Sequence, residues 1–396
     1  MMRLTDVRRG ASELMAQSRG LAHPKQIDFA DRGWQFWPGR EDLSAAFMRV
    51  LASAQEGGST ISECWLTAAR IDLEATSSWS EEWSKTAEIN ERRAGDSFSN
   101  GNVATACRNW LRAANYYQVA ASQADIPPDL MSVAVEGMRR CAYSYVKSRS
   151  PAGEVVEIPW LADFSLQGYF LPSSLSGERP VVICIGEPGS RKEEILAKYA
   201  SHAYEHGMSL LAVDLLGHDF TWNPERIAEA HAFDAAISHI LDFLVGKSGV
   251  DEKRIAIVAD DWSSSLVSRA VANDPRFAAA VCDGGIWELQ EQAFLRWQAT
   301  GVEDDHWLDR PNLVLRSIAC PVLVTAGEVG WLQSDTLAEF GRRLNRSHPD
   351  ATLRLFTREE TAAAQSHSDN PTLANELIFD WIADRLRLRD KSLDRD

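Results

Sequence analysis

The 396-residue chain lacks several features that would assign it to a well-defined class of protein. It has no run of about 18 consecutive apolar residues, so no transmembrane helix is predicted. Its basic N-terminus also has no apolar core of the length that a signal peptide needs. The six cysteines include no Cys-x-x-Cys pair and mostly lie in apolar segments, which predicts buried thiols in a reducing compartment. We therefore expect a cytoplasmic protein.

Positive charge is also scarce. The chain has 41 Lys and Arg against 57 Asp and Glu, a net charge of −16. This balance argues against nucleic acid and against an anionic membrane surface as partners, because both need a basic face. No GxxxxGK[ST] loop occurs, no GxGxxG follows a predicted strand, and no His, Cys and Asp residues have the spacing of a metal site. We expect a small-molecule substrate, and neither a metal nor a nucleotide cofactor.

Residues 1–150 show a helical pattern and no strand-type alternation. Apolar residues recur there at spacings of four and seven: Trp79, Trp83, Ala87, Ala94 and Phe98. Asn100-Gly101 and Ile126-Pro127-Pro128 interrupt the pattern, which predicts three or four helices separated by short turns. This region is predicted to be an all-helical N-terminal cap domain.

The pattern changes after Ser150-Pro151, and residues 151–390 are predicted to form a second domain. Eight short apolar runs follow, most of them separated by helical stretches: EVVEIPWL, DFSLQGYFLP, PVVICIG, SLLAVDLLG, RIAIVADD, AAAVCDGG, PVLVTAGE and TLRLFT. Apolar strands that alternate with helices predict an α/β fold with a mainly parallel sheet covered on both faces.

The strongest functional signal follows the strand predicted at 254–258. There Ala259-Asp260-Asp261-Trp262-Ser263 leads directly into a predicted helix, which is the layout of a nucleophile elbow. An elbow needs small residues two positions before and two after the nucleophile. With Ala259 and Ser263 in those positions, Asp261 stands where a serine is usual. Placing Ser263 there instead would lengthen the strand by two residues.

The chain resembles the α/β hydrolases that carry a helical N-terminal domain, the group of the FrsA-like proteins, 2,6-dihydroxypseudooxynicotine hydrolase and the fungal polyketide-shortening hydrolases. The resemblance covers most of the chain and rests on segments that occur in order: WSEEW at 79–83, the helix at 107–117, IPWL with LQGYFLP, GEPGSRKEE, AVDLLGH and SHSDNPTLANELIFDWIADRL. It implies an α/β-hydrolase fold, a cofactor-free serine triad, a polyketide-like substrate and a homodimer formed through the helical region.

Two positions depart from the family's triad. Asp261 replaces the serine, and the acid position after the seventh strand falls on Gly330. His367 remains between the last strand and the final helix, where the order nucleophile, acid, histidine places the base. A substitute acid to orient His367 is expected at the end of the sixth strand, where Asp283 and Glu288 are available, and we favour Asp283.

An aspartate in the serine position changes the chemistry that the site can perform. A carboxylate is ionised at neutral pH and can attack an alkyl carbon that carries a leaving group, forming an ester that water activated by His367 then cleaves. Dehalogenases and epoxide hydrolases of this fold also have Trp directly after the Asp, as in Asp261-Trp262. Alternatively, Asp261 acts as a base in an elimination, its pKa raised by burial. A catalytically silent binding protein is the third hypothesis.

The remaining predicted site residues surround this pair. The backbone N–H of Trp262 and one between Glu187 and Gly189 are expected to form the oxyanion hole. An insertion at about 287–311, which contains Trp287 and Trp297, is predicted to form a lid over the pocket. The 14 tryptophans favour an aromatic cleft between the two domains and a sizeable apolar substrate.

Overall fold

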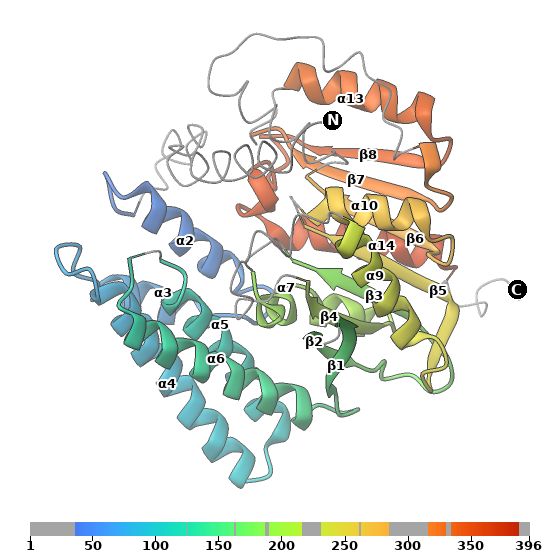
Figure 1. Cartoon of the computed structure of the whole chain (residues 1–396). Helices are drawn as coiled ribbons and strands as arrows, with labels where there is room; N and C mark the ends of the chain where they lie inside the picture. The colour runs from blue at the N-terminus through green and yellow to red at the C-terminus, as the bar shows by residue number, and fades with distance from the viewer. Residues whose placement is uncertain are drawn as a thin grey trace, which may run out of the picture.

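The N-terminal part of the chain forms helices, and strands begin after Ser150-Pro151, as the sequence predicts (Figure 1). The computed structural model describes residues 36–123, 125–161, 164–186, 190–215, 231–260, 263–284, 316–329 and 334–387. Within this part of the chain, the helical region contains α2 (Glu41–Ala52), α3 (Ile61–Ala68), α4 (Ser78–Ser99), α5 (Val103–Ala120) and α6 (Pro128–Ser148).

The prediction of three or four helices is therefore too low, because two short helices precede α4. Their junction contains Gly57, whose φ of +78° lies in the left-handed region that glycine adopts without strain. Thr60 then begins α3, since its side chain accepts a hydrogen bond from the backbone N–H of Glu63. The two breaks predicted further along the chain are present, after α4 and after α5.

Tryptophans form the core of the helical region. Trp83 is fully buried and stacks on Tyr116 with ring centroids 5.6 Å apart, and Trp79 lies against both Trp37 and Trp83. The indole N–H of Trp79 donates to the carbonyl of Val119 over 2.8 Å. These tryptophans pack within the bundle and do not line a cleft between the two domains, so for them the expectation of an aromatic cleft is wrong.

Each of the eight apolar runs forms a strand, and together they form one sheet. The strands are β1 (Glu154–Leu161), β2 (Phe164–Leu171), β3 (Arg179–Ile185), β4 (Ser209–Asp214), β5 (Val250–Ala259), β6 (Ala279–Asp283), β7 (Val322–Gly327) and β8 (Ala351–Phe356). Their order is β1-β2-β4-β3-β5-β6-β7-β8. β2 is antiparallel to both of its neighbours. The other strands of the series β4-β3-β5-β6-β7-β8 are parallel to one another. The predicted fold class is confirmed.

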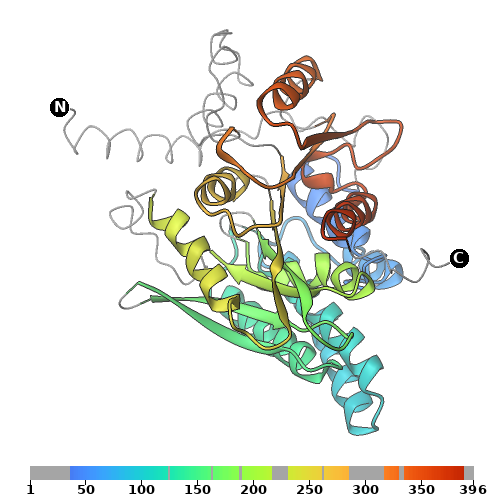
Figure 2. The same cartoon turned by 90° about the vertical axis from the view of Figure 1, so that its right-hand side faces the viewer.

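Successive residues of the strands bury against opposite layers of helices, because side chains alternate along a strand. In β3, Val182 and Cys184 belong to one apolar cluster, whereas Val181, Ile183 and Ile185 belong to the other. The first cluster includes α7 (Lys192–Glu205) and α14 (Pro371–Arg385); the second includes α9 (His231–Leu244), α10 (Ser263–Asn273) and α13 (Ser334–Ser347). Figure 2 shows helices on both sides of the sheet.

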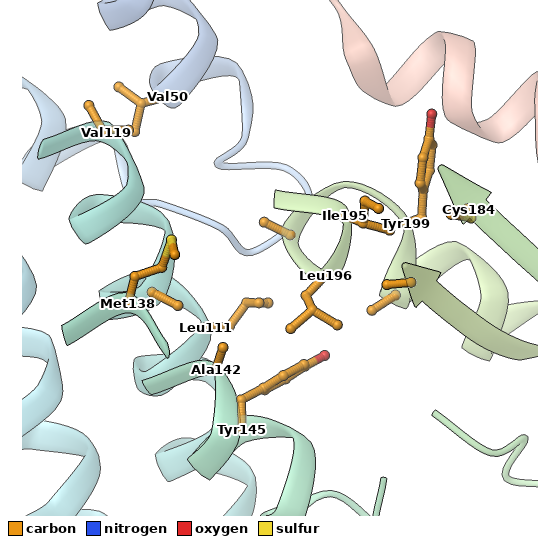
Figure 3. Packing of buried hydrophobic residues seen from close by; sticks show 14 of the residues in the cluster. Val50, Leu111, Val119, Met138, Ala142, Tyr145, Cys184, Ile195, Leu196 and Tyr199 are labelled. Atoms are coloured by element: carbon orange, nitrogen blue, oxygen red, sulfur yellow. The ribbon is translucent and has the colours of Figure 1, made fainter. Parts of the chain in front are cut away.

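The helical region packs on the same side of the sheet as α7. Leu111 of α5 and Tyr145 of α6 lie next to Leu196 of α7, whereas Ile195 lies beside Tyr199 on the side of α7 that faces Cys184 (Figure 3). All of them are buried in one continuous cluster. α7 is therefore covered by the sheet on one side and by the helical region on the other.

The cysteines are free and mostly buried, as the sequence predicts. All six cysteines are free thiols, and five of them are buried. Burial raises the pKa of Cys64 to about 11 and that of Cys320 to about 12. Among the helices that the structure describes, none has the length and apolarity needed to span a membrane.

A buried contact between a histidine and a carboxylate joins the helical region to α7. Nε2 of His202 lies 2.8 Å from Oε2 of Glu56, which precedes α3, and both side chains are less than a tenth exposed. The hydroxyl of Ser201 donates to the same carboxylate oxygen over 3.1 Å. Burial favours a higher pKa for Glu56, but its contacts with His202 outweigh burial, and the pKa is lowered. An ionised carboxylate therefore stabilises this junction.

Substitution of Glu56→Gln is expected to lower the free energy of unfolding by roughly 3 kcal/mol, because it leaves His202 buried without its charged partner. The folded-state pKa of Glu56 lies below its ordinary value of 4.5, so this stabilisation is present above that pH and is lost as the pH falls through the folded-state pKa. Denaturant unfolding at neutral and at acidic pH measures the loss. Glu154→Gln, which breaks an exposed pair with Lys247, is the control and should cost less than about 1 kcal/mol. Equal losses of unfolding free energy in the two variants would contradict a stabilising role for the buried Glu56 carboxylate.

Candidate active site

The predicted elbow lies between β5 and α10. β5 ends at Ala259 and α10 begins at Ser263, so Asp261 is the middle of the three residues that connect them in sequence. Asp261 and Trp262 lie outside the described residues. Asp260 is described: its backbone N–H donates to the carbonyl of Ile185 over 3.1 Å, and its carbonyl accepts from the N–H of Ser263 over 2.9 Å. The turn is therefore bonded at its start to the end of β3.

Ser263, the alternative elbow residue, lies in α10, and its hydroxyl is already engaged in a hydrogen bond. It is 1% exposed, and its Oγ donates to the carbonyl of Gly186 over 2.6 Å. This bond ties the start of α10 to the loop after β3. The contact gives Ser263 a structural role in holding the two loops together.

Asp283 and His367 meet at the carboxyl edge of the sheet. Asp283 is the last residue of β6, and His367 ends the short helix η3 (Gln365–His367), which follows β8. Nε2 of His367 lies 3.0 Å from Oδ1 of Asp283, and the two side chains are 3% and 4% exposed. The hydroxyl of Thr325 at the end of β7 donates to the same Oδ1 over 3.0 Å. Because the carboxyl ends of parallel strands share one edge, β6, β7 and the segment that follows β8 supply this cluster.

The charges of the pair stabilise each other. Burial opposes the charged form of His367, but the adjacent Asp283 carboxylate outweighs burial and raises the pKa of the ring above its ordinary value of 6.5. Burial also opposes the charge on Asp283, and His367 outweighs it there too, so the pKa of this carboxyl falls below its ordinary value of 3.8. The pair is therefore an imidazolium and a carboxylate at mildly acidic pH.

The other ring nitrogen of His367 is held by the backbone. Nδ1 lies 2.6 Å from the carbonyl oxygen of Ala362 and donates its proton to it. The Nε2 contact with Asp283 is close, but Nε2 has no partner in hydrogen-bond geometry among the described residues. The ring is thus oriented by Ala362, and Nε2 is buried beside the Asp283 carboxylate.

Sequence reasoning missed a second charged pair next to the elbow. Nζ of Lys198 lies 2.9 Å from Oδ2 of Asp260, and the hydroxyl of Tyr199 donates to Oδ1 over 2.7 Å. Lys198 and Tyr199 belong to α7, more than 60 residues before Asp260, so no local motif connects them. The available signal was the Asp260-Asp261 doublet itself, because adjacent carboxylates at a buried turn require a compensating cation.

A further polar cluster surrounds the start of α7 at Lys192. Nζ of Lys192 lies 2.8 Å from Asp214 at the end of β4, and the hydroxyl of Tyr169 donates to Glu193 over 2.8 Å. Lys192 thus faces two carboxylates, Asp214 at 2.8 Å and Glu193 at 3.4 Å, and these contacts fit a structural role. Among the residues that the structure describes, no group of three or more His, Cys, Asp or Glu side chains could hold a metal ion.

Several predicted site residues lie outside the described residues. They are the oxyanion-hole residues Glu187, Gly189 and Trp262, the vacant acid position Gly330, the alternative acid Glu288, and the lid at 287–311 with Trp287 and Trp297. Their roles stay predictions.

Replacing Asp283 by Asn should destabilise the fold by roughly 3–5 kcal/mol at mildly acidic pH, because it leaves a buried imidazolium unpaired. The contribution of Asp283 to the free energy of unfolding is present above pH 3.8. The contribution of His367 is complete below pH 6.5 and is lost as the pH rises through the raised pKa of the ring. The cost of Asp283→Asn should therefore be smaller in alkaline solution than between these two values.

Chemical denaturation across this pH range makes the measurement. Asp242→Asn, which breaks an exposed pair with Arg276, is the matched control, with an expected loss below about 1 kcal/mol at every pH. A cost of Asp283→Asn that does not change with pH would contradict the ion pair.

The sequence is similar to those of known α/β hydrolases. A family model described as "Esterase FrsA-like" matches residues 66–291. The hydrolyase poxO of Penicillium oxalicum is 24% identical over 306 residues, which cover 74% of this chain and 67% of that protein. The 20-hydroxy-prefusarin hydrolase FUS2 of Gibberella moniliformis is 26% identical over 269 residues, which cover 64% of each chain. The matched region thus spans about two thirds of the length of these relatives.

Two solved structures share the fold. The crystal structure of 2,6-dihydroxy-pseudo-oxynicotine hydrolase superposes with a TM-score of 0.65 at 18% identity, covering 85% of this chain and 95% of that one. The AbyA5 wild-type structure superposes with a TM-score of 0.57 at 18% identity, covering 88% and 100%. These identities establish the fold alone, whereas the family model covers more than half of the sequence. The chain therefore belongs to the FrsA-like esterase family and is an α/β hydrolase.

Proposed function

We propose that this α/β hydrolase cleaves a C–O bond of a sizeable apolar small molecule without a cofactor, through an ester formed on Asp261. The observation that carries the proposal is the buried Asp283–His367 ion pair at the carboxyl edge of the sheet. Ser264, the second residue of α10, links this pair to the elbow, because its hydroxyl donates to the carbonyl of Asp283 over 2.7 Å.

In the first step the carboxylate of Asp261 attacks the substrate carbon, and the bond from that carbon to the leaving oxygen breaks. The charged His367 ring donates its Nε2 proton to this oxygen, so the leaving group departs as a neutral alcohol or acid. An imidazolium is the form that the contact with Asp283 favours before the reaction. The products of this step are an alkyl ester on Asp261 and a neutral ring.

In the second step water attacks the carbonyl carbon of the Asp261 ester. The neutral His367 takes one proton from this water. The alkyl–oxygen product leaves with one oxygen of the original carboxylate and takes the second proton of the water, so that it departs as an alcohol and Asp261 is again ionised. Asp283 stabilises the imidazolium that forms again, and the backbone N–H groups of the oxyanion hole stabilise the charge on the ester oxygen. The enzyme returns to its starting charges.

The wider functional assignments follow from the family and from the sequence. The substrate is proposed to be a polyketide-like secondary metabolite, in line with relatives such as the 20-hydroxy-prefusarin hydrolase FUS2. Residues 1–150 are proposed to act as a cap and as the homodimer interface, and the 287–311 insertion as the lid. The reducing environment suggested by the six free cysteines fits a cytoplasmic enzyme.

Turnover in oxygen-18 water should place label in the peptide that contains Asp261, because water attacks the aspartyl carbonyl. An aryl-substituted β-acetoxy ketone is a suitable probe, since its acetate is a leaving group on an alkyl carbon. Acetate can leave without a proton from His367, so His367→Gln should slow mainly the second step and accumulate an adduct of the alkyl fragment on the same peptide, detected by mass spectrometry. His348→Gln is the control, because His348 is a buried histidine whose Nε2 is bonded to the carbonyl of Ile318. Active enzyme without label in Asp261 would exclude the ester.

Elimination is the second candidate, with Asp261 as the general base. One observation favours it: Nδ1 of His367 is bonded to Ala362 and Nε2 contacts Asp283, so the resting ring has no free site to accept a proton from water. The same β-acetoxy ketone separates the two reactions. Elimination releases acetate and a conjugated enone, whose ultraviolet absorbance appears with no label in Asp261, whereas the ester route yields the β-hydroxy ketone.

A further inference from the structure

The carboxylate of Asp260 is held on two sides by α7. It accepts a hydrogen bond from the hydroxyl of Tyr199, 2.7 Å from Oδ1, and pairs with Nζ of Lys198, 2.9 Å from Oδ2. Tyr199 is 1% exposed and Asp260 is 9% exposed. The side-chain amide of Asn375 in α14 donates to the carbonyl of Lys198 over 3.2 Å. The helix that holds Asp260 is therefore itself fixed to its neighbour.

The contacts continue from Asp260 to the Asp283–His367 pair. The carbonyl of Asp260 accepts from the N–H of Ser263, the first residue of α10. The hydroxyl of the next residue, Ser264, lies 2.7 Å from the carbonyl of Asp283 and 3.1 Å from that of Ala259. A displacement of Asp260 would therefore move both the elbow and the end of β6.

Among the described residues of this region, Lys198 and His367 carry positive charge, and Asp260 and Asp283 carry negative charge. Asp261, which lies outside the described residues, adds a further carboxylate to the elbow. Lys198 acts on both members of the other pair and favours lower pKa values for Asp283 and His367. Two further titratable groups face the same region, Tyr199 and Cys184 of β3, and burial raises the pKa of both, so they are neutral. Removing the charge of one of the four changes the net charge of this mostly buried region by one unit.

We propose that Lys198 and Asp260 are positioning residues of this active site: Asp260 fixes the strand-to-helix turn against α7, and Lys198 supplies the charge that sets when His367 releases its proton. The inference rests on the proposed function, because it takes the Asp283–His367 pair as the acid–base centre. Without Lys198, the net negative charge holds the proton on His367 to higher pH. Without the charge of Asp260, the net positive charge favours its release.

An NMR titration of the His367 ring in the full chain tests this proposal without any substrate. The ring signal is identified among those of the nine histidines by its absence in His367→Gln. Lys198→Met should raise the midpoint of the titration by about one pH unit, the size expected for loss of one nearby charge. Asp260→Asn should lower the midpoint, and Lys198→Arg should keep it close to that of the unmodified protein.

Lys85→Met is the matched control, because Lys85 is an exposed lysine of α4 that pairs with Glu82. It should leave the His367 midpoint unchanged. An unchanged midpoint in folded Lys198→Met, or shifts of the same sign in Lys198→Met and Asp260→Asn, would overturn the proposal. If Lys198→Met does not fold, the lowered midpoint in Asp260→Asn decides the question.

The result is independent of the ester mechanism. Opposite shifts in Lys198→Met and Asp260→Asn, together with an Asp261 peptide that takes up no label, would leave this inference standing and remove the aspartyl ester. Label in Asp261 together with an unchanged midpoint in both variants would support the aspartyl ester and overturn this inference.

Discussion

The structure depends most on one constraint: a histidine and a carboxylate that are both nearly sealed from solvent stay charged only if each neutralises the other. His367 and Asp283 satisfy it with a contact of 3.0 Å. An unpaired ion in their place would cost several kcal/mol. The fold is therefore stable only with both members of this pair in place. The strand ends, the turn after β8 and the hydroxyl of Thr325 hold the two side chains together.

α7 connects this pair to the rest of the molecule. On one side it packs in the apolar cluster shared with the helical region, and on the other it presents Lys198 and Tyr199 to Asp260. His202, on the same helix, pairs with Glu56 across the junction of the two regions. One helix thus carries ionic contacts to the helical region and to the elbow, so the position of the helical region and the geometry of the site are coupled through its packing.

Much of the fold could be predicted because the strands are nearly continuous apolar runs, as expected for a sheet buried on both faces. The proximity of Asp283 and His367 also followed from sequence, since parallel strands end at one edge. The contacts of Asp260 could not be predicted, because its partners lie on a helix distant in sequence. The ring orientation of His367 was equally out of reach, since it depends on the carbonyl of Ala362. Tryptophan content alone does not predict a cleft, because Trp79 and Trp83 pack in the helical core.

The functional account depends on the proposed departure of the elbow from the family's serine. In the proposed mechanism, Asp261 is a nucleophile that needs no activation, and His367 acts first as an acid and then as a base. The charge on His367 suits the first role, and loss of its proton to the leaving group creates the second. The order of the two roles is thus a consequence of the ion pair.

A high-resolution crystal structure that defines the Asp261 carboxylate relative to the His367 ring tests this account most directly. We expect the carboxylate and Nε2 of His367 to face one cavity, within hydrogen-bond distance or with a single water between them, while Asp283 remains against the ring. A carboxylate of Asp261 that points away from the ring, or is sealed from any cavity, would contradict the account.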